Sequence, residues 1–405
     1  MEDREKYLQL KSVIIHIVLF LITLTTVVVS SFLYTNRMEQ IIRNSVICVV
    51  CLGTIIFLLC QARMNHSYQE DNEEHPLRFA VWFLVGVILA VLLPILPVTG
   101  WPYVAVFIIL TLFSNVLVGI VSSTFLLLLS VLLSTSADVN TFCLYFVSGI
   151  ICSILFQKLD DDFKIGYPMM ITVMVIILCE MANSVLFVNE TLHWELLIIP
   201  AVNVIVSAIL ILIILKLYGQ LVVFKFRERF QIINDSECPL MVELKEKQPD
   251  LYIHTVHVAY LSDRLANALK LDTQCVKTMS YYYKIGILAG EPGETTYENA
   301  VSMIEDFEFP SVTYPYLKDV IENPLYPTTK EAFVVLIADM MISSVEFLYA
   351  KNPNKEIQYE QVIHTLLKKK IESAFPNKCG ITYGEMDTVK QILLEEKLYY
   401  DFLHR

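Results

Sequence analysis

The chain has few charged residues for its length. Only 18% of its 405 residues are Asp, Glu, Lys or Arg, whereas 55% are hydrophobic, and the mean hydropathy is +0.56. This composition is too apolar for a soluble globule, but it is too mixed for a pure bundle of membrane helices. Runs with strict alternation of apolar and polar residues are also absent, so the sequence predicts no β-sheet.

Basic charge is also scarce. The 42 acidic residues outnumber the 30 basic ones, which gives a net charge of −12. Because phosphate binding needs a basic surface, we expect no nucleic acid among the partners.

A cysteine metal site is not indicated either, since Cys48 and Cys51 form a CxxC in an apolar run with no second pair or nearby histidine.

What the chain does contain is long apolar runs in its first half. Their lengths predict about eight membrane spans, near 12–34, 45–62, 79–97, 103–121, 123–134, 141–157, 168–188 and 194–217. The fifth is short, and a broken or re-entrant element is the alternative. We divide the chain into an N-terminal span with a short extracellular loop (1–44), a seven-span bundle (45–220), a juxtamembrane linker (221–235) and a cytoplasmic helical domain (236–405).

Basic residues predict the orientation of these spans. The loops on one side hold most of the Lys and Arg residues, whereas those on the other side hold only Arg37 and Arg43. Since basic loops remain in the cytoplasm, both termini should be cytoplasmic. Lys225, Arg227 and Arg229 then follow the last span, where they would contact anionic lipid headgroups.

Two polar residues stand out inside a predicted span. Glu180 and Asn183 lie near the middle of 168–188, where a carboxylate is costly unless it is paired or faces water. Hydrogen bonding between helices is one explanation. A ligand or proton site is the other.

The second half is predicted to be entirely helical. Helices are expected near 238–247, 251–269, 273–288, 297–307, 314–323, 329–350, 356–374 and 383–403. Asp272 should cap the third of these, and Thr382 with Glu385 should form a capping box at the last. The apolar stretch Ala332–Val345 is shorter than about 18 residues and contains Asp339, so we expect a buried core helix rather than a span.

Three segments of this half carry a recognisable pattern: HTVHVA from His254, YYYKIGI from Tyr281 and TTKEAFVVLIAD ending at Asp339. They resemble the HD phosphohydrolase superfamily, and most closely the seven-transmembrane HD family of membrane-anchored phosphodiesterases that cleave cyclic di-AMP. In that resemblance His254 and Asp339 match the first and last metal ligands. Tyr283 and Lys284 occupy the positions of the central His-Asp pair.

The resemblance implies a helical HD domain that uses iron or manganese, but this chain departs from the pattern. It has no histidine between His257 and His364, so the family's additional histidine ligands have no counterpart. We therefore expect no metal cofactor, with His254 and Asp339 as a vestige of the ligand set. The segment Thr35–Asn44 is also too short for the family's extracellular domain, so an outside signal would have to be small, lipidic or a membrane protein.

Lys284 suggests what replaces the metal. Asp339 has apolar helical neighbours, and an unpaired buried carboxylate is expensive. We predict that Lys284 pairs with Asp339 beside His254, the alternative being that both have moved to solvent. His257 and Lys330 are candidate ligand contacts, and the Tyr283 hydroxyl could touch a ligand phosphate.

Three functions remain open. The first is a regulatory or nucleotide-sensing pseudoenzyme in the bacterial plasma membrane, whose partners would be the bilayer, a cyclic dinucleotide, and a second copy or another membrane protein. The second is an active phosphodiesterase with a rebuilt site of His254, His257 and Asp339, which the loss of the His-Asp pair opposes. The third is a structural or dimerisation module.

Overall fold

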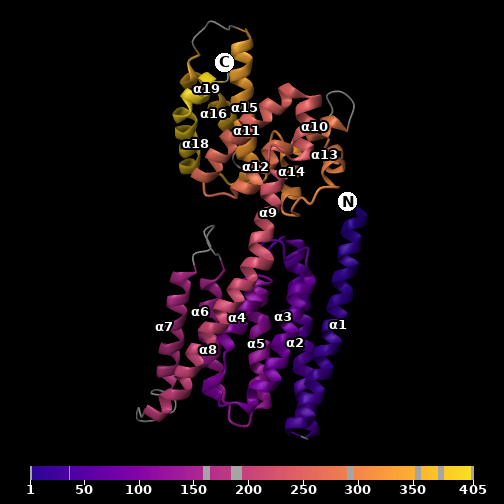
Figure 1. Ribbon diagram of the computed structural model, residues 1–405, viewed down its shortest axis with the longest axis vertical. Helices are drawn as coiled ribbons and strands as arrows, with labels where there is room; N and C mark the ends of the chain where they lie inside the picture. The colour runs from indigo at the N-terminus through magenta and orange to yellow at the C-terminus, as the bar shows by residue number, and fades with distance from the viewer. Residues whose placement is uncertain are drawn as a thin grey trace. The chain divides into compact units, whose positions relative to one another are not determined.

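The structure, a computed structural model, is built of helices in two compact units (Figure 1). It describes residues 2–35, 37–157, 165–183, 194–289, 296–351, 357–372 and 378–402. These residues contain no strand, which confirms the predicted all-α fold. The chain divides between Lys225 and Phe226. We call residues 2–225 the membrane unit and residues 226–405 the helical unit.

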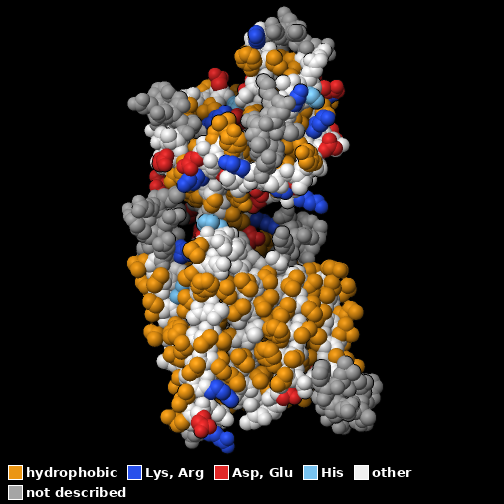
Figure 2. All heavy atoms as spheres, turned by 180° about the vertical axis from the view of Figure 1, so that it is seen from behind, with side chains coloured by type: hydrophobic (Ala, Val, Ile, Leu, Met, Phe, Trp, Pro, Cys, Tyr) orange, Lys and Arg blue, Asp and Glu red, His pale blue; other side chains and the backbone are white. Residues whose placement is uncertain are grey.

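The membrane unit contains eight helices in its described part. They are α1 (Glu2–Thr35), α2 (Met38–Met64), α3 (Pro76–Leu92), α4 (Tyr103–Leu112), α5 (Val116–Leu133), α6 (Val139–Leu155), α7 (Gly166–Ala182) and α8 (Trp194–Tyr218). Five of them, α1, α2, α3, α5 and α8, are long and apolar enough to cross a membrane, while α4, α6 and α7 are shorter. Figure 2 shows hydrophobic side chains covering this unit as a broad band.

The predicted limits of the fourth and fifth spans are wrong. The sequence predicted a long span over 103–121 and a short one over 123–134, but α4 has 10 residues and α5 has 18. The apolar run breaks after Phe113, and Asn115 caps α5 by accepting a hydrogen bond from the Val118 amide at 2.9 Å. A hydropathy pattern does not register such a break, because the residues on both sides are apolar.

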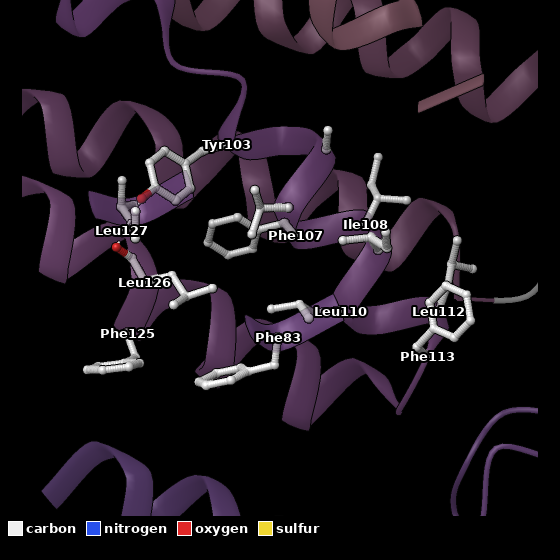
Figure 3. Close-up of a cluster of buried hydrophobic side chains, with 14 of the residues drawn as sticks. Phe83, Tyr103, Phe107, Ile108, Leu110, Leu112, Phe113, Phe125, Leu126 and Leu127 are labelled. Carbon is white, nitrogen blue, oxygen red and sulfur yellow. Dashed lines mark hydrogen bonds between the residues drawn. The ribbon is translucent and has the colours of Figure 1, made fainter. Parts of the chain in front are cut away.

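Helix α4 forms the core of the membrane unit. All ten of its residues are buried, so no side of the helix faces lipid. In Figure 3 its side chains extend toward Phe83 of α3 and toward Phe125 and Leu126 of α5. The hydroxyl of Tyr103 donates to the Leu126 carbonyl at 3.0 Å, so the polar atom at the start of α4 also has a partner.

The contact of α4 with α5 depends on Gly119. A Cβ atom at this position would lie 2.4 Å from the Cα atom of Thr111, closer than packed carbon atoms can approach. Gly119→Ala should therefore separate the two helices and lower the free energy of unfolding by about 1–3 kcal/mol. Thermal unfolding of the intact protein in detergent measures this change. Gly53→Ala is the matched control, because no atom lies within 4 Å of its added methyl group, and equal melting temperatures for the two variants would contradict the prediction.

The helical unit is also wholly helical in its described part. Its helices are α9 (Phe224–Ile233, which begins just before the unit), α10 (Pro239–Lys247), α11 (Pro249–Ala268), α12 (Thr273–Tyr282), α13 (Tyr297–Ile304), α14 (Thr313–Glu322), α15 (Lys330–Lys351), α16 (Tyr359–Glu372), α18 (Tyr383–Glu395) and α19 (Lys397–Phe402). Two predicted helices are wrong in extent. The one over 273–288 ends at Tyr282 before a 3₁₀ turn, and the one over 383–403 is interrupted at Glu396.

Local capping accounts for several of these helix ends. Asp272 accepts a hydrogen bond from the Cys275 amide at 3.0 Å, and Thr382 and Glu385 form the predicted capping box. The start of α15 is fixed by Asp319 of α14, whose carboxylate accepts hydrogen bonds from the amides of Thr328 and Thr329. Each cap satisfies backbone donors that the first turn of a helix leaves free.

Helix α15 lies in the core of the helical unit. By length and composition it would qualify as a membrane span. However, residues 332–338 are all buried, and the helix packs against α11, α12 and α14. It is therefore a core helix of this unit, as the sequence predicted.

Candidate functional site

Five side chains from α11, the end of α12 and α15 form a hydrogen-bonded group, which we call the ionic cluster: His254, Tyr283, Lys284, Asp339 and Glu346. Asp339 is its hub. Its Oδ1 atom lies 2.8 Å from the Lys284 Nζ atom, 2.8 Å from His254 Nε2 and 2.6 Å from the Tyr283 hydroxyl. The second imidazole nitrogen, Nδ1 of His254, lies 2.9 Å from the Glu346 carboxylate. The predicted ion pair of Lys284 with Asp339 is thus confirmed.

The local fold brings these side chains together. His254 lies on the buried face of α11, and Tyr283 and Lys284 lie where α12 gives way to the 3₁₀ turn Ile285–Leu288. Helix α15 presents Asp339 and, two turns later, Glu346 on the same face. Lys284 also lies 4.8 Å from the centre of the Tyr283 ring, a distance that suits a cation–π contact.

The surroundings shift the ionisation of the cluster. Burial alone lowers the pKa of His254, but the hydrogen bonds with Asp339 and Glu346 outweigh it and raise that pKa above its usual value. Burial alone raises the pKa of Asp339, yet the hydrogen bond from His254 and the charge and hydrogen bond of Lys284 hold it well below its usual range. Burial and the adjacent Asp339 charge raise the pKa of Tyr283 well above its usual value. The cluster therefore favours imidazolium, ammonium and carboxylate together.

This donor set does not suit a divalent metal ion. A histidine ligand must offer a lone pair, but each ring nitrogen of His254 lies within 3 Å of a carboxylate, and the raised pKa favours the imidazolium, which has no lone pair to offer. The Lys284 ammonium, 3.2 Å from His254 Nε2, adds a positive charge where an ion would lie. Within the described ranges, no group of three or more His, Cys, Asp or Glu side chains could hold a metal ion.

The two candidate ligand contacts lie elsewhere. His257 bonds to the Tyr399 hydroxyl at 2.6 Å, and Lys330 forms a 2.5 Å ion pair with Glu385 of α18. Both join helices of the unit to each other. The Tyr283 hydroxyl is likewise engaged with Asp339. In this arrangement His257 Nδ1, the Lys330 ammonium and the Tyr283 hydroxyl each bond to another side chain of the unit.

Glu180 and Asn183, the polar pair predicted inside a span, lie where the described part of α7 ends. Helix α7 ends at Ala182, so Glu180 is in its last turn and Asn183 is the residue that caps it. Both side chains are buried. The end of the predicted span 168–188 stays a prediction, because residues 184–188 lie outside those that the structure describes.

Glu346 is a member of the cluster that the sequence analysis missed. The family resemblance marks only the ligand positions, and Glu346 matches none of them. The available signal was its spacing from Asp339, since residues seven apart share one face of a helix. A carboxylate at that spacing, on a helix facing a buried histidine, indicates a second partner for the imidazole.

A cleft of about 770 Å³ lies beside the cluster, between α15 and α16. Asp339 lines it, and its other lining includes Ser343 and Phe347 of α15 and Gln361 and Thr365 of α16. Its volume is in the range of sites that bind small molecules. Neutral polar groups with one exposed aromatic ring suit a ligand that combines a flat ring with hydrogen-bonding atoms.

Stability should depend on pH through His254 and Asp339. Because the folded state raises the pKa of His254, this residue contributes fully to the free energy of unfolding below about pH 6.5. The contribution is lost as the pH rises through the pKa of His254 in the folded state. Because the pKa of Asp339 is depressed, its contribution is complete above about pH 4 and is lost as pH falls through its folded value.

We therefore expect the helical unit to lose stability as the pH rises above about 6.5, and urea unfolding of the intact protein, followed by circular dichroism, measures this loss. In His254→Gln this loss should be absent. A variant with the same alkaline loss as the wild type would assign the effect to another group.

Comparisons with known proteins return one solved structure. No family model matches the chain, and no curated protein matches its sequence. The chain is similar over part of its length to the HD domain of the L. monocytogenes phosphodiesterase PgpH, with 15% sequence identity and a TM-score of 0.33. The match covers 40% of this chain and 99% of the PgpH domain. Likeness at this level carries no information on activity.

Proposed function

We propose that the chain is a membrane-anchored regulatory pseudoenzyme, whose helical unit is a degenerate HD domain that binds a ligand without hydrolysing it. The observation that carries the proposal is the Lys284 ammonium 2.8 Å from Asp339, with both nitrogens of His254 bonded to carboxylates. Metal-dependent hydrolysis requires ions that lower the pKa of a bound water and clamp phosphate oxygens. An ammonium and an imidazolium supply positive charge but cannot coordinate that water.

The cleft between α15 and α16 supports a ligand-binding role over a purely structural one. It opens beside Asp339, and Phe347 offers an exposed ring on which a nucleobase could stack. Together with the motif resemblance, this favours a cyclic dinucleotide such as cyclic di-AMP as the ligand. The proposal also places the chain in the bacterial plasma membrane with both termini in the cytoplasm, on the basis of its basic loops.

Metal content and ligand binding of the purified, intact protein test the proposal. We expect no stoichiometric iron or manganese, no turnover of cyclic di-AMP, and saturable binding of that nucleotide in calorimetry. Phe347→Ala should weaken binding by about tenfold, the loss of one stacking contact. Lys390→Ala, an exposed position on α18 that does not line the cleft, is the control.

The outcomes separate the three functions. Bound transition metal together with phosphodiester turnover would make the protein an enzyme and refute the proposal. No metal and no nucleotide binding would leave a structural or dimerisation module, and would refute it as well. Binding without turnover, weakened by Phe347→Ala alone, supports it.

A further inference from the structure

A second polar cluster lies inside the membrane unit, where α6, α7 and α8 meet the segment between α3 and α4. Glu180 of α7 accepts a hydrogen bond from the amide of Asn203 of α8, with 3.2 Å between Oε1 and Nδ2. The same amide donates to the Thr99 carbonyl at 3.0 Å. Glu180 and Asn203 are 4% and 2% exposed, so this contact is closed to solvent.

Neighbouring groups extend the cluster to the backbone. The Tyr145 hydroxyl of α6 donates to the Val98 carbonyl at 2.7 Å and accepts from the Trp101 amide at 3.2 Å. The Ser207 hydroxyl donates to the side-chain oxygen Oδ1 of Asn203 at 3.1 Å, which fixes the orientation of that side-chain amide. The irregular segment 98–101 is therefore held to α6 and α8 by the same side chains that surround Glu180.

One oxygen of Glu180 stands apart from this network. Its Oε2 atom is buried and has no hydrogen-bond partner. It borders a small hollow with no room for a water molecule, so solvent cannot hydrate the carboxylate in this arrangement. An ionised carboxylate in such a place needs a cation beside it.

The described lining of this hollow carries no positive charge. Among the described residues that line the hollow there is no Lys, Arg or His. The titratable side chains that face Glu180 are Tyr145 from α6 and Cys179 from α7, and both add negative charge if they ionise. Helix α8 contributes the neutral Asn203 and Ser207, α4 contributes Val104, and the segment before α4 contributes Trp101.

We propose that Glu180 is a reversible proton-binding site of the membrane unit. With the proton bound, the neutral carboxylic acid fits the closed contact of α6, α7 and α8. Release of the proton leaves an unhydrated charge, so the contact must loosen until water reaches Oε2. Because Glu180 lies in the last turn of α7, next to the 98–101 segment, the proton exchanges from that end of the bundle. The proton concentration on one side of the membrane thus controls how tightly α6, α7 and α8 pack against one another.

The test is the infrared spectrum and melting temperature of the intact protein in detergent as pH is raised. At neutral pH we expect a carbonyl-stretch band of a protonated carboxylic acid that is missing in Glu180→Gln. As the pH is raised further this band should disappear, and the melting temperature should fall by about 3 °C or more as the contact loosens. Glu180→Gln keeps the shape of the neutral acid, so its melting temperature should not show this fall as the pH is raised.

Glu39→Gln removes an exposed carboxylate of α2 and is the control, which should behave as the wild type. Absence of the Glu180 band at neutral pH would show an ionised carboxylate and overturn the proposal. A band that persists at alkaline pH with no change in melting would show a permanently neutral structural group and would also overturn it. Because this site lies in the membrane unit, neither result bears on ligand binding by the helical unit.

Discussion

Replacing Asp339 with asparagine should destabilise the helical unit by about 3 kcal/mol, the cost of removing one partner from a buried ionic group. The carboxylate faces both Lys284 and His254 at 2.8 Å and also accepts the Tyr283 hydroxyl. Without its charge, the ammonium and the imidazolium repel each other in a largely buried site. Hydrogen exchange of α11 and α15 peptides in the intact protein, measured by mass spectrometry, reports the loss locally.

Two further variants test the reason for this loss. Lys284→Met with Asp339→Leu removes the ion pair and fills its space with apolar groups, so it should recover most of the stability that Asp339→Asn loses. Lys397→Met breaks an exposed pair with Glu360 of similar length, 2.6 Å, and should cause no measurable change. If Asp339→Asn matched Lys397→Met, the cluster would contribute nothing to the fold.

Restoring the family's central pair should create metal binding where the wild type has none. Tyr283→His with Lys284→Asp removes the ammonium that opposes a cation and adds an imidazole and a carboxylate beside Asp339. It also removes the Tyr283 hydroxyl and the Lys284 ammonium, which lie 3.3 Å and 3.2 Å from Nε2 of His254. We expect about one manganese ion per chain after dialysis against excess metal, because four ligands then converge on one point.

The control for this gain uses the same substitutions on the same helix. Tyr281→His with Lys277→Asp adds an imidazole and a carboxylate to α12 outside the cluster, and should bind no manganese. Metal bound equally by both double variants would show adventitious binding. Metal bound by the wild type would contradict the idea that Lys284 has replaced the ion.

The sequence predicted the helical unit well because its signals are local. Amphipathic spacing and capping residues such as Asp272 determine where helices begin, and three short segments located four members of the cluster. Glu346 was missed because its role depends on a partner 92 residues away in sequence, His254. Local patterns do not report which buried residue a carboxylate will face.

The membrane unit was harder for a different reason. Nearly every residue near α4 is apolar, so hydropathy could not locate the break at Phe113–Asn115. The break is set by Asn115 capping α5 and by the tight contact of Gly119 with Thr111, both of which appear only in three dimensions. A prediction from hydropathy therefore located eight apolar helices in the described part of this unit, but gave the wrong limits for the fourth and fifth, and only five of the eight are long enough to cross a membrane.

The two ends of α15 have different surroundings, and this has a consequence for communication within the helical unit. Asp319 and the Lys330–Glu385 pair anchor the first turn, whereas Phe347 and its neighbours line the open cleft. Asp339 belongs to the lining of the cleft and is also the hub of the ionic cluster. A molecule in the cleft that displaced the Asp339 carboxylate would therefore disturb Lys284 and His254 as well, because both bond to the same oxygen.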